Sequence, residues 1–286
     1  MIGVPPAAGT DRGTLQQGAV AVGLGVVGVA AQISYPLVEG AWRDSVTVAV
    51  VLLLAAACVA HAAATRGARW AVGLVLITAG GGLLAEVIGT ATGVPFGSYA
   101  YTTQGAFGPE AGSVPLLIGP AWTSGAYPAW CAAQALVGPG RGAVTVLVAA
   151  WGLASWDLYL DPQMVADRRW VWHTPGPTLP GVPEVPLSNY AGWLLVALML
   201  GAALHGLDRA LRTSPHGQDG LPLALFCWTW LGSALAHVMF LDLPAAAGYG
   251  LLGMGLIGMP LVRKLLLTRL GPAQRCPHRA RTRPGR

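Results

Sequence analysis

Three carboxyl side chains stand inside apolar stretches of the sequence, where an ionisable group is costly and is therefore a candidate for function. Glu86 lies in one stretch, and Asp157 and Asp161 lie four residues apart in another. This spacing puts both aspartates on one face of a helix, one turn apart. Two carboxyl groups so close in a low dielectric resist ionising together, so one can keep its proton and act as a general acid. The three residues predict acid–base catalysis.

The remaining residue types argue against several other chemistries. The six histidines are scattered, without the clusters that a membrane di-iron desaturase or hydroxylase needs. Neither a Walker A loop nor a G-x-S-x-G elbow is present. Two G-x-G-x-x-G strings start at Gly23 and Gly253 inside apolar runs, where they indicate helix packing. The four cysteines contain no C-x-x-C pair. We therefore expect no metal site and no bound cofactor.

The composition indicates an integral membrane protein. Of the 286 residues, 54% are hydrophobic and 10% are charged, and the mean hydropathy is +0.56. A soluble domain carries roughly 25% charged residues. Residues 263–286 hold eight of the 17 basic residues and no acidic one, so the rest of the chain has a net charge of −3. A basic tail of this kind suits a surface of anionic lipid, and the body is not expected to bind nucleic acid.

Uncharged stretches long enough to cross a bilayer, about 20 residues each, recur along the chain. We predict transmembrane helices near residues 18–38, 45–65, 69–90, 114–137, 142–161, 189–207, 221–241 and 244–262. The fourth contains three prolines, which predict a kink or an unwound turn. Asp161 directly precedes Pro162, so the fifth helix is expected to end there, at the aqueous interface.

The fold class is therefore all-α, a polytopic transmembrane helix bundle of about eight spans. We expect a short cytoplasmic N-terminus at 1–17, a transmembrane helical domain at 18–262 and a disordered cytoplasmic tail at 263–286. With eight spans, one side of the membrane receives 14 basic residues and the other receives three. Because basic residues concentrate in cytoplasmic loops, both termini are expected to be cytoplasmic, in a protein of the plasma membrane whose first span is not cleaved.

The carboxyl groups are expected to lie at a similar depth. Glu86 follows Arg69 by 17 residues, and Asp157 follows Arg141 by 16 residues. At 1.5 Å per residue, both lie roughly 25 Å from the cytoplasmic end of their helices. This depth places them near the non-cytoplasmic loops of residues 91–113 and 162–188, which are rich in glycine, proline and aromatic residues.

Eleven tryptophans are many for this length, and five of them gather between residues 151 and 193. These are Trp151, Trp156, Trp170, Trp172 and Trp193. Their expected position is an aromatic belt at the membrane interface. The alternative is that their ring faces stabilise a cation and line an apolar ligand site.

Two blocks of sequence resemble the membrane carotenoid-biosynthesis protein family. The first reads E-x-x-G-x-x-x-G-x-P-F-G-x-Y from Glu86 to Tyr99, and it continues through Tyr101 and Val114-Pro115 to Trp122. The second comprises Trp156-Asp157, Tyr159, Asp161-Pro162, Trp170-Val-Trp172, Ser188-Asn189-Tyr190 and Gly192-Trp193. This chain departs from the pattern at Arg168-Arg169, where a glycine turn is expected, and in the longer proline-rich segment from Pro175 to Pro186.

The resemblance implies a carotenoid hydratase, which adds water to a terminal isopropylidene double bond of an acyclic carotenoid. It implies Asp157, Glu86 and Asp161 as catalytic residues, one protonating the alkene and a second orienting the water. It implies a substrate-binding set of Phe96, Tyr99, Tyr101, Trp122, Trp156, Tyr159, Trp172, Asn189 and Trp193. The expected partners are a lipid-soluble carotenoid, membrane lipid and other enzymes of the carotenoid pathway.

Two other functions stay open. The D-x-x-x-D spacing of Asp157 and Asp161 could bind a magnesium diphosphate, as in a membrane prenyltransferase. That chemistry needs a second aspartate-rich motif, which the sequence lacks, and the expected topology puts the motif on the side away from a cytoplasmic diphosphate. The chain could also be a non-catalytic carotenoid-binding assembly protein, in which the carboxyl groups are structural.

Overall fold

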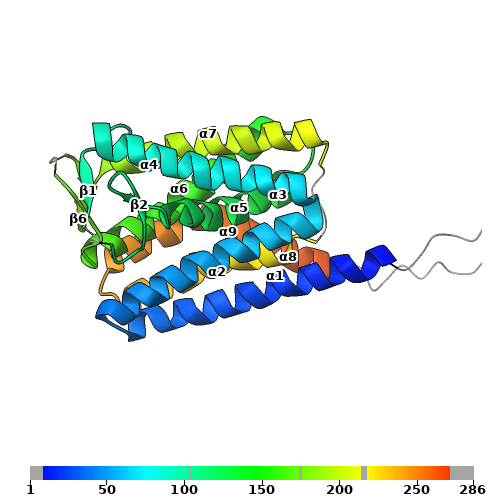
Figure 1. The fold of residues 1–286 in the computed structure, drawn as a ribbon, viewed down its shortest axis with the longest axis horizontal. Helices are drawn as coiled ribbons and strands as arrows, with labels where there is room; N and C mark the ends of the chain where they lie inside the picture. The colour runs from blue at the N-terminus through cyan, green and yellow to red at the C-terminus, as the bar shows by residue number, and fades with distance from the viewer. Residues whose placement is uncertain (1–8, 103–104, 174–175, 214–217, 271–286) are drawn as a thin grey trace, which may run out of the picture.

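Helices lying side by side make up the body of the molecule (Figure 1). The computed structural model describes residues 9–102, 105–173, 176–213 and 218–270. The helices are α1 (Gly9–Ser34), α2 (Gly40–Arg66), α3 (Ala68–Val75), α4 (Gly81–Thr92), α5 (Ile118–Val137), α6 (Gly142–Ala166), α7 (Leu187–Leu211), α8 (Gly220–Met239) and α9 (Pro244–Leu270). A 3-10 turn, η1 (Tyr35–Leu37), follows α1, and a π-helical turn, η2 (Leu76–Gly80), joins α3 and α4 into one rod.

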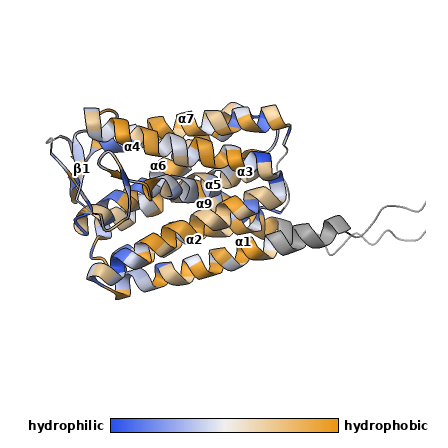
Figure 2. Ribbon diagram, in the orientation of Figure 1, coloured by the Kyte–Doolittle hydropathy of each residue, from blue (hydrophilic) through white to orange (hydrophobic). Residues whose placement is uncertain are grey.

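The all-α membrane bundle expected from the sequence is confirmed. Seven helical segments of the described chain are long and apolar enough to cross a membrane, with α3, η2 and α4 counted as one. The remaining helix, α5, lies inside the bundle, where it packs against α2, α6 and α8. Because other helices cover α5, its surface need not be strongly apolar. Figure 2 shows the complementary pattern, with apolar residues along the outer helices and hydrophilic ones gathered at their ends.

Several boundaries differ from the expected ones. The helix α5 begins at Ile118 and runs unbroken through Pro128, without an unwound turn; the irregular turn of the bundle is η2 instead. The helix α1 starts at Gly9, well before residue 18. At the other end of the chain, α9 continues to Leu270, so the first part of the expected disordered tail is helical. Residues 1–8 and 271–286 lie outside the described residues.

The two long loops fold together at one end of the bundle (Figure 1). They form three antiparallel two-stranded sheets: β1 (Tyr99–Tyr101) with β4 (Trp170–Trp172), β2 (Glu110–Ala111) with β3 (Val114–Pro115), and β5 (Thr178–Leu179) with β6 (Val182–Pro186). The first sheet joins the loops to each other, with Tyr99 opposite Trp172 and Tyr101 opposite Trp170. The alternation of a strand therefore turns aromatic side chains from both loops toward the same face.

A separate polar network lies at the opposite end of the bundle. Arg66 of α2 pairs with Asp219 at 3.3 Å, at the start of α8. Asp208 of α7 accepts hydrogen bonds from Trp70 Nε1 and from the Gln134 amide nitrogen Nε2, each at 2.7 Å. These contacts connect helices that the sequence separates widely, and they partner charges that would otherwise be costly to bury.

The orientation in the membrane stays a prediction. In Figure 1 the start of α1 and the end of α9 both lie on the side away from the strands, so the two described ends of the chain are at the same end of the bundle. Reporter fusions to the C-terminus should be active only in a cytoplasmic format, and a reporter inserted at Gly176 should be active only on the other side. The opposite pattern of activity would reverse the expected orientation.

Candidate functional site

The three carboxyl groups predicted from the sequence lie at the strand end of the bundle, and all are buried. Their exposed fractions are 6% for Glu86, 0% for Asp157 and 3% for Asp161. Glu86 comes from α4, and the two aspartates come from α6. Among the described residues, none of the three takes part in a salt bridge. Buried charge of this kind must be stabilised by hydrogen bonds.

Three donors surround the Glu86 carboxyl group. The hydroxyl groups of Tyr99 and Tyr101 both donate to Oε2, the second at 2.9 Å, and Trp122 Nε1 donates to Oε1 at 3.3 Å. Burial and the neighbouring Glu86 carboxylate raise the pKa of Tyr99 and of Tyr101 above the ordinary value, so both phenols keep the protons they donate. An ionised carboxylate accepts about four hydrogen bonds, so Glu86 retains one acceptor position on Oε1.

The first sequence block is the local structure that builds this arrangement. Gly89 lies one turn beyond Glu86, and a side chain there would come within 2.7 Å of the Phe96 ring and 3.2 Å of the Tyr99 hydroxyl group. Gly93 then ends α4 with a φ of +76°, which glycine adopts without strain. The chain reverses at this point, so Tyr99 returns to the helix that carries Glu86. The spacing E-x-x-G-x-x-x-G…Y is therefore a helix, its left-handed cap and the returning donor.

The other two carboxyl groups, those of Asp157 and Asp161, share the side-chain amide of Asn189. Asn189 Nδ2 of α7 donates to Asp157 Oδ2 at 2.8 Å and also to Asp161 Oδ2, so the two carboxyl groups share one donor. Two carboxyl groups held this close in a low dielectric resist ionising together, so one of them can keep its proton. Asp157 Oδ1 is buried and has no hydrogen-bond partner among the described residues. The pair can thus hold a proton beside an oxygen that no described residue engages.

The position of Asp161 corrects an expectation. The sequence predicts that Asp161 ends its helix at the aqueous interface, but α6 continues through Pro162 to Ala166 and Asp161 is buried. Proline lacks one backbone donor, yet α6 continues past Pro162 to its cap, where Asp167 N donates to Gln163 O at 3.0 Å. The side chain of Trp170 folds back from β4 and donates its Nε1 hydrogen to Asp161 Oδ1 at 3.0 Å. Asp161 is therefore part of the buried cluster.

Aromatic rings enclose the carboxyl groups, which corrects the expectation of an interfacial belt for two of the five clustered tryptophans. Trp170 and Trp193 are buried inside the bundle rather than exposed at its surface. Trp193 stacks on Trp122 with ring centroids 4.1 Å apart, and Trp156 meets Trp193 edge to face at 6.1 Å. Tyr99 stacks on Trp172 at 5.5 Å. These ring faces carry the partial negative charge that attracts a cation.

A small cavity of about 30 Å³ lies between the two carboxyl groups of Glu86 and Asp161. Its volume suits one or two water molecules, and its polar walls supply the hydrogen-bond partners that a buried water molecule needs. Seven residues of the substrate-binding set predicted from the sequence line it, namely Phe96, Tyr99, Tyr101, Trp122, Trp172, Asn189 and Trp193. The structure thus brings together most of the predicted site.

Two predicted binding residues lie elsewhere. The Tyr159 hydroxyl group donates to Trp230 O at 3.0 Å, and its ring contacts His237, so this side chain points toward α8 rather than toward the carboxyl groups. Trp156 contacts Trp193 but lines a different, larger cavity. The residue that the sequence-based set missed is Trp170. In β4 Trp170 shares one face with Trp172, an arrangement that three alternating residues are too few to predict.

The turn before β4 accounts for one departure from the family pattern. Arg168 adopts a φ of +57°, a left-handed conformation that favours glycine. The Arg168 carbonyl group accepts a hydrogen bond from Thr102 Oγ1 at 2.5 Å, and the Arg169 carbonyl group accepts one from Thr102 N at 2.8 Å. The expected turn is thus present with arginine in it, and Thr102, directly after β1, holds it in place.

Metal-ligand clusters are not a feature of the described residues, which contain no group of three or more His, Cys, Asp and Glu side chains placed to hold an ion. The site's polar groups are instead three carboxyl groups, one carboxamide, two phenols and two indoles. This set can store a proton, deliver it and orient a water molecule, which is the chemistry of general acids and bases.

Comparisons with known proteins identify the family of this chain. The sequence profile of the carotenoid biosynthesis protein family matches residues 47–257. The bisanhydrobacterioruberin hydratase of Haloarcula japonica is 32% identical over 177 residues, which cover 58% of this chain and 58% of that protein. No solved structure matches. Because the family profile covers well over half of the chain, the chain belongs to the carotenoid biosynthesis protein family.

Proposed function

We propose that this integral membrane protein is a carotenoid hydratase, a hydro-lyase that adds water to the terminal isopropylidene double bond of an acyclic carotenoid. The observation that carries the proposal is the water-sized cavity between Glu86 and Asp161, with the buried Asp157–Asp161 pair beside it. The named activity of the relative from Haloarcula japonica points to the same class of reaction. The proposed location is the plasma membrane, where the substrate dissolves in the bilayer.

The first step is proton transfer to carbon. The Asp157–Asp161 pair gives its proton to the CH carbon of the terminal (CH₃)₂C=CH group, and the π electrons form the new C–H bond. The positive charge remains on the tertiary carbon. The stacked rings of Trp122 and Trp193, together with the carboxylates, stabilise this cation as it forms.

The second step is capture of the cation by water. A water molecule in the small cavity donates a hydrogen bond to the free acceptor position of Glu86, which directs an oxygen lone pair toward the cationic carbon. When the C–O bond forms, the water loses a proton to the carboxyl cluster. This proton replaces the one given to the alkene, so the cluster returns to its starting protonation. The net change is the addition of one water molecule, with no electron donor or acceptor.

The geometry supports hydration better than diphosphate chemistry. The Asn189 amide nitrogen donates hydrogen bonds to one oxygen of each aspartate. A magnesium ion would need these same oxygens as ligands. In the described part of the site, no lysine or arginine contacts the aspartates to bind a diphosphate. A prenyltransferase would require magnesium and a prenyl diphosphate for activity.

Expression in a host that accumulates lycopene, an acyclic carotene, tests the proposal. Membranes containing the protein should convert lycopene into products heavier by the mass of one or two water molecules, without added nucleotide, flavin or iron. Liquid chromatography with mass spectrometry measures the products. A product extended by a prenyl unit would replace the hydratase with a prenyltransferase, and unchanged lycopene bound to the protein would indicate a carotenoid-binding assembly protein.

A further inference from the structure

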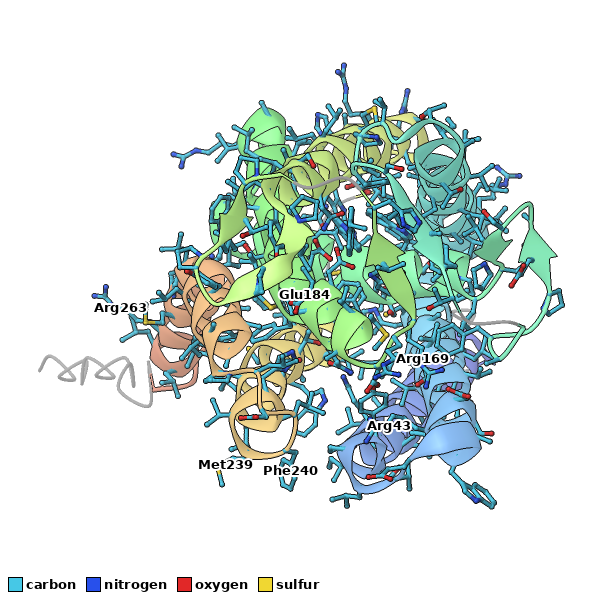
Figure 3. The ribbon with its side chains drawn as sticks, turned by 90° about the vertical axis from the view of Figure 1, so that its left-hand side faces the viewer. Arg43, Arg169, Glu184, Met239, Phe240 and Arg263 are labelled. Carbon is cyan, nitrogen blue, oxygen red and sulfur yellow. The ribbon has the colours of Figure 1, made fainter. Side chains whose placement is uncertain are left out.

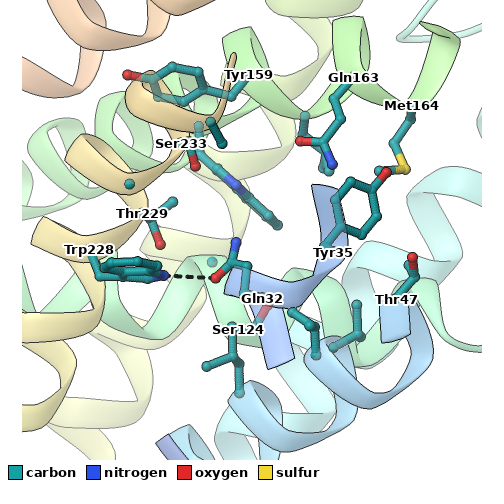
Figure 4. Close-up of a pocket in the computed structure, with 18 of the residues that line it drawn as sticks. Gln32, Tyr35, Thr47, Ser124, Tyr159, Gln163, Met164, Trp228, Thr229 and Ser233 are labelled. Carbon is teal, nitrogen blue, oxygen red and sulfur yellow. Dashed lines mark hydrogen bonds between the residues drawn. The ribbon is translucent and has the colours of Figure 1, made fainter. Parts of the chain in front are cut away.

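A second, larger cavity adjoins the candidate site. Its volume is about 280 Å³, and it lies between the α1–α2 hairpin on one side and α5, α6 and α8 on the other (Figure 4). We call it the lipid-side groove. Ile118, Leu160 and Trp170 line both this groove and the small cavity. The side chains of these three residues therefore form the boundary between the groove and the carboxyl cluster.

Most side chains that line the groove are apolar, and several of its polar side chains are hydrogen-bonded to other groups of the protein. Trp228 Nε1 donates to Gln32 Oε1 at 2.9 Å (Figure 4). Thr47 Oγ1 donates to Arg43 O, and Ser124 Oγ donates to Ala121 O, both at 2.8 Å within their own helices. These groups use their hydrogen-bonding capacity on the protein itself, which favours a ligand without polar groups along its length.

The rim of the groove indicates where such a ligand enters. Ile33 and Leu37 lie on the hairpin side, and Leu235 and Phe240 lie on the α8 side; each is more than half exposed. Figure 3 shows Phe240 at the end of α8, facing outward beside the hairpin. In a membrane-spanning helix, exposed apolar side chains contact lipid tails. The groove thus opens to the hydrocarbon of the bilayer.

The strand end of the groove is closed by ion pairs. Arg43 of α2 pairs with Asp167 at 2.7 Å, Arg169 pairs with Asp44 of α2 at 2.5 Å, and the Tyr35 hydroxyl group donates to Asp167. Both arginines lie at this end in Figure 3. An apolar ligand that arrived from the aqueous side would have to break these contacts, whereas one arriving from the bilayer would not.

We propose that the lipid-side groove binds the polyene chain of the carotenoid, which enters laterally from the bilayer between α1 and α8 with its reactive end directed to the carboxyl cluster. This inference rests on the proposed function for the identity of the ligand. It adds a binding site that the carboxyl cluster alone does not provide, because the small cavity holds only water-sized molecules. It also separates the apolar substrate from the water until both meet at Trp170 and Leu160.

Matched tryptophan substitutions test the groove. Val51→Trp and Thr229→Trp place an indole inside it, whereas Leu52→Trp and Leu231→Trp place the same side chain on neighbouring, lipid-facing positions of the same helices that do not line it. Each full-length variant would be expressed in a lycopene-producing host and purified in detergent. Bound lycopene and its hydrated products would be quantified per protein by absorption and mass spectrometry, and thermal unfolding would be recorded.

The groove variants should lose at least tenfold of both the bound pigment and the hydrated product, while the lipid-facing variants should match the wild type. Equal amounts of bound pigment in Val51→Trp and Leu52→Trp, at equal thermal stability, would contradict binding of the polyene in the groove. Phospholipid retained in the groove in place of lycopene, seen by native mass spectrometry, would also overturn it.

Pigment binding distinguishes failure of the groove from failure of the proposed function. In the Asp157→Asn background, lycopene that remains bound and unconverted, and that is lost on adding Thr229→Trp, supports the groove independently of turnover. If the wild type binds lycopene in the groove but never hydrates it, the binding site is supported and the hydratase reaction is contradicted. If hydration proceeds at the wild-type rate in every groove variant, the reaction is supported and polyene binding in the groove is contradicted.

Discussion

Asp157→Asn is expected to lower the rate of carotenoid hydration by about 100- to 10,000-fold, the range that a positioned general acid or base contributes. The amide is nearly isosteric with the carboxyl group but cannot deliver the proton. Its oxygen can still accept the hydrogen bond from Asn189, and its nitrogen can take the place of Oδ1, which has no partner among the described residues. The fold should therefore survive, and the abundance of the protein in the membrane should stay close to that of the wild type.

Asp161→Asn provides the informative comparison. Both Asp161 oxygens already accept hydrogen bonds, one from Trp170 and one from Asn189, so an amide nitrogen there would face a donor. We expect this variant to lose both activity and stability, with a penalty of about 1–3 kcal/mol, because an existing hydrogen bond is lost and two buried donors then face each other. Hydration at the wild-type rate in Asp157→Asn, with product measured per amount of protein, would remove the Asp157–Asp161 pair from the mechanism.

Glu86→Gln should lower hydration by at least about 100-fold, because the variant loses the negative charge that orients the water and stabilises the cation. It should also reduce stability. Tyr99, Tyr101 and Trp122 all donate to the two carboxylate oxygens, and an amide offers only one oxygen to the three donors. We expect a loss of about 1–3 kcal/mol in the free energy of unfolding.

Tyr101→Phe is the matched control for Glu86→Gln. It removes one donor but leaves the carboxylate and its other two donors in place, so activity should fall less than tenfold. Thermal unfolding of purified protein and product formation per amount of protein separate the two effects. A Glu86→Gln variant that is less stable but fully active per folded molecule would assign Glu86 a structural role only.

The meeting of Glu86 with the aspartates could be predicted from the sequence, because helix rise is constant and the basic residues at Arg69 and Arg141 mark the same membrane side. Helix geometry also put Asp157 and Asp161 on one face. The burial of Asp161 could not be predicted in this way. It depends on Trp170, nine residues further along, whose indole reaches the carboxyl group only after the chain reverses at Arg168.

The strand pairing that completes the site depends on contacts distant in sequence. Tyr99 and Trp172 are opposite each other only because the two loops pair, and neither loop has an alternating apolar run long enough to predict a strand. The groove has the same origin, since it lies between the hairpin of α1 and α2 and the helices α5, α6 and α8, which are distant in sequence. Local pattern predicts the elements, and tertiary contacts determine which faces meet.

The most direct test of the hydratase is the source of the oxygen atom in the product. Membranes containing the protein would be incubated with lycopene in ¹⁸O-labelled water under ordinary air, and in a parallel sample with ordinary water under ¹⁸O-labelled dioxygen. Protonation followed by water capture predicts that the new hydroxyl group carries the label from water and none from dioxygen. Label from dioxygen would show an oxygenase and contradict the acid–base mechanism assigned to Glu86, Asp157 and Asp161.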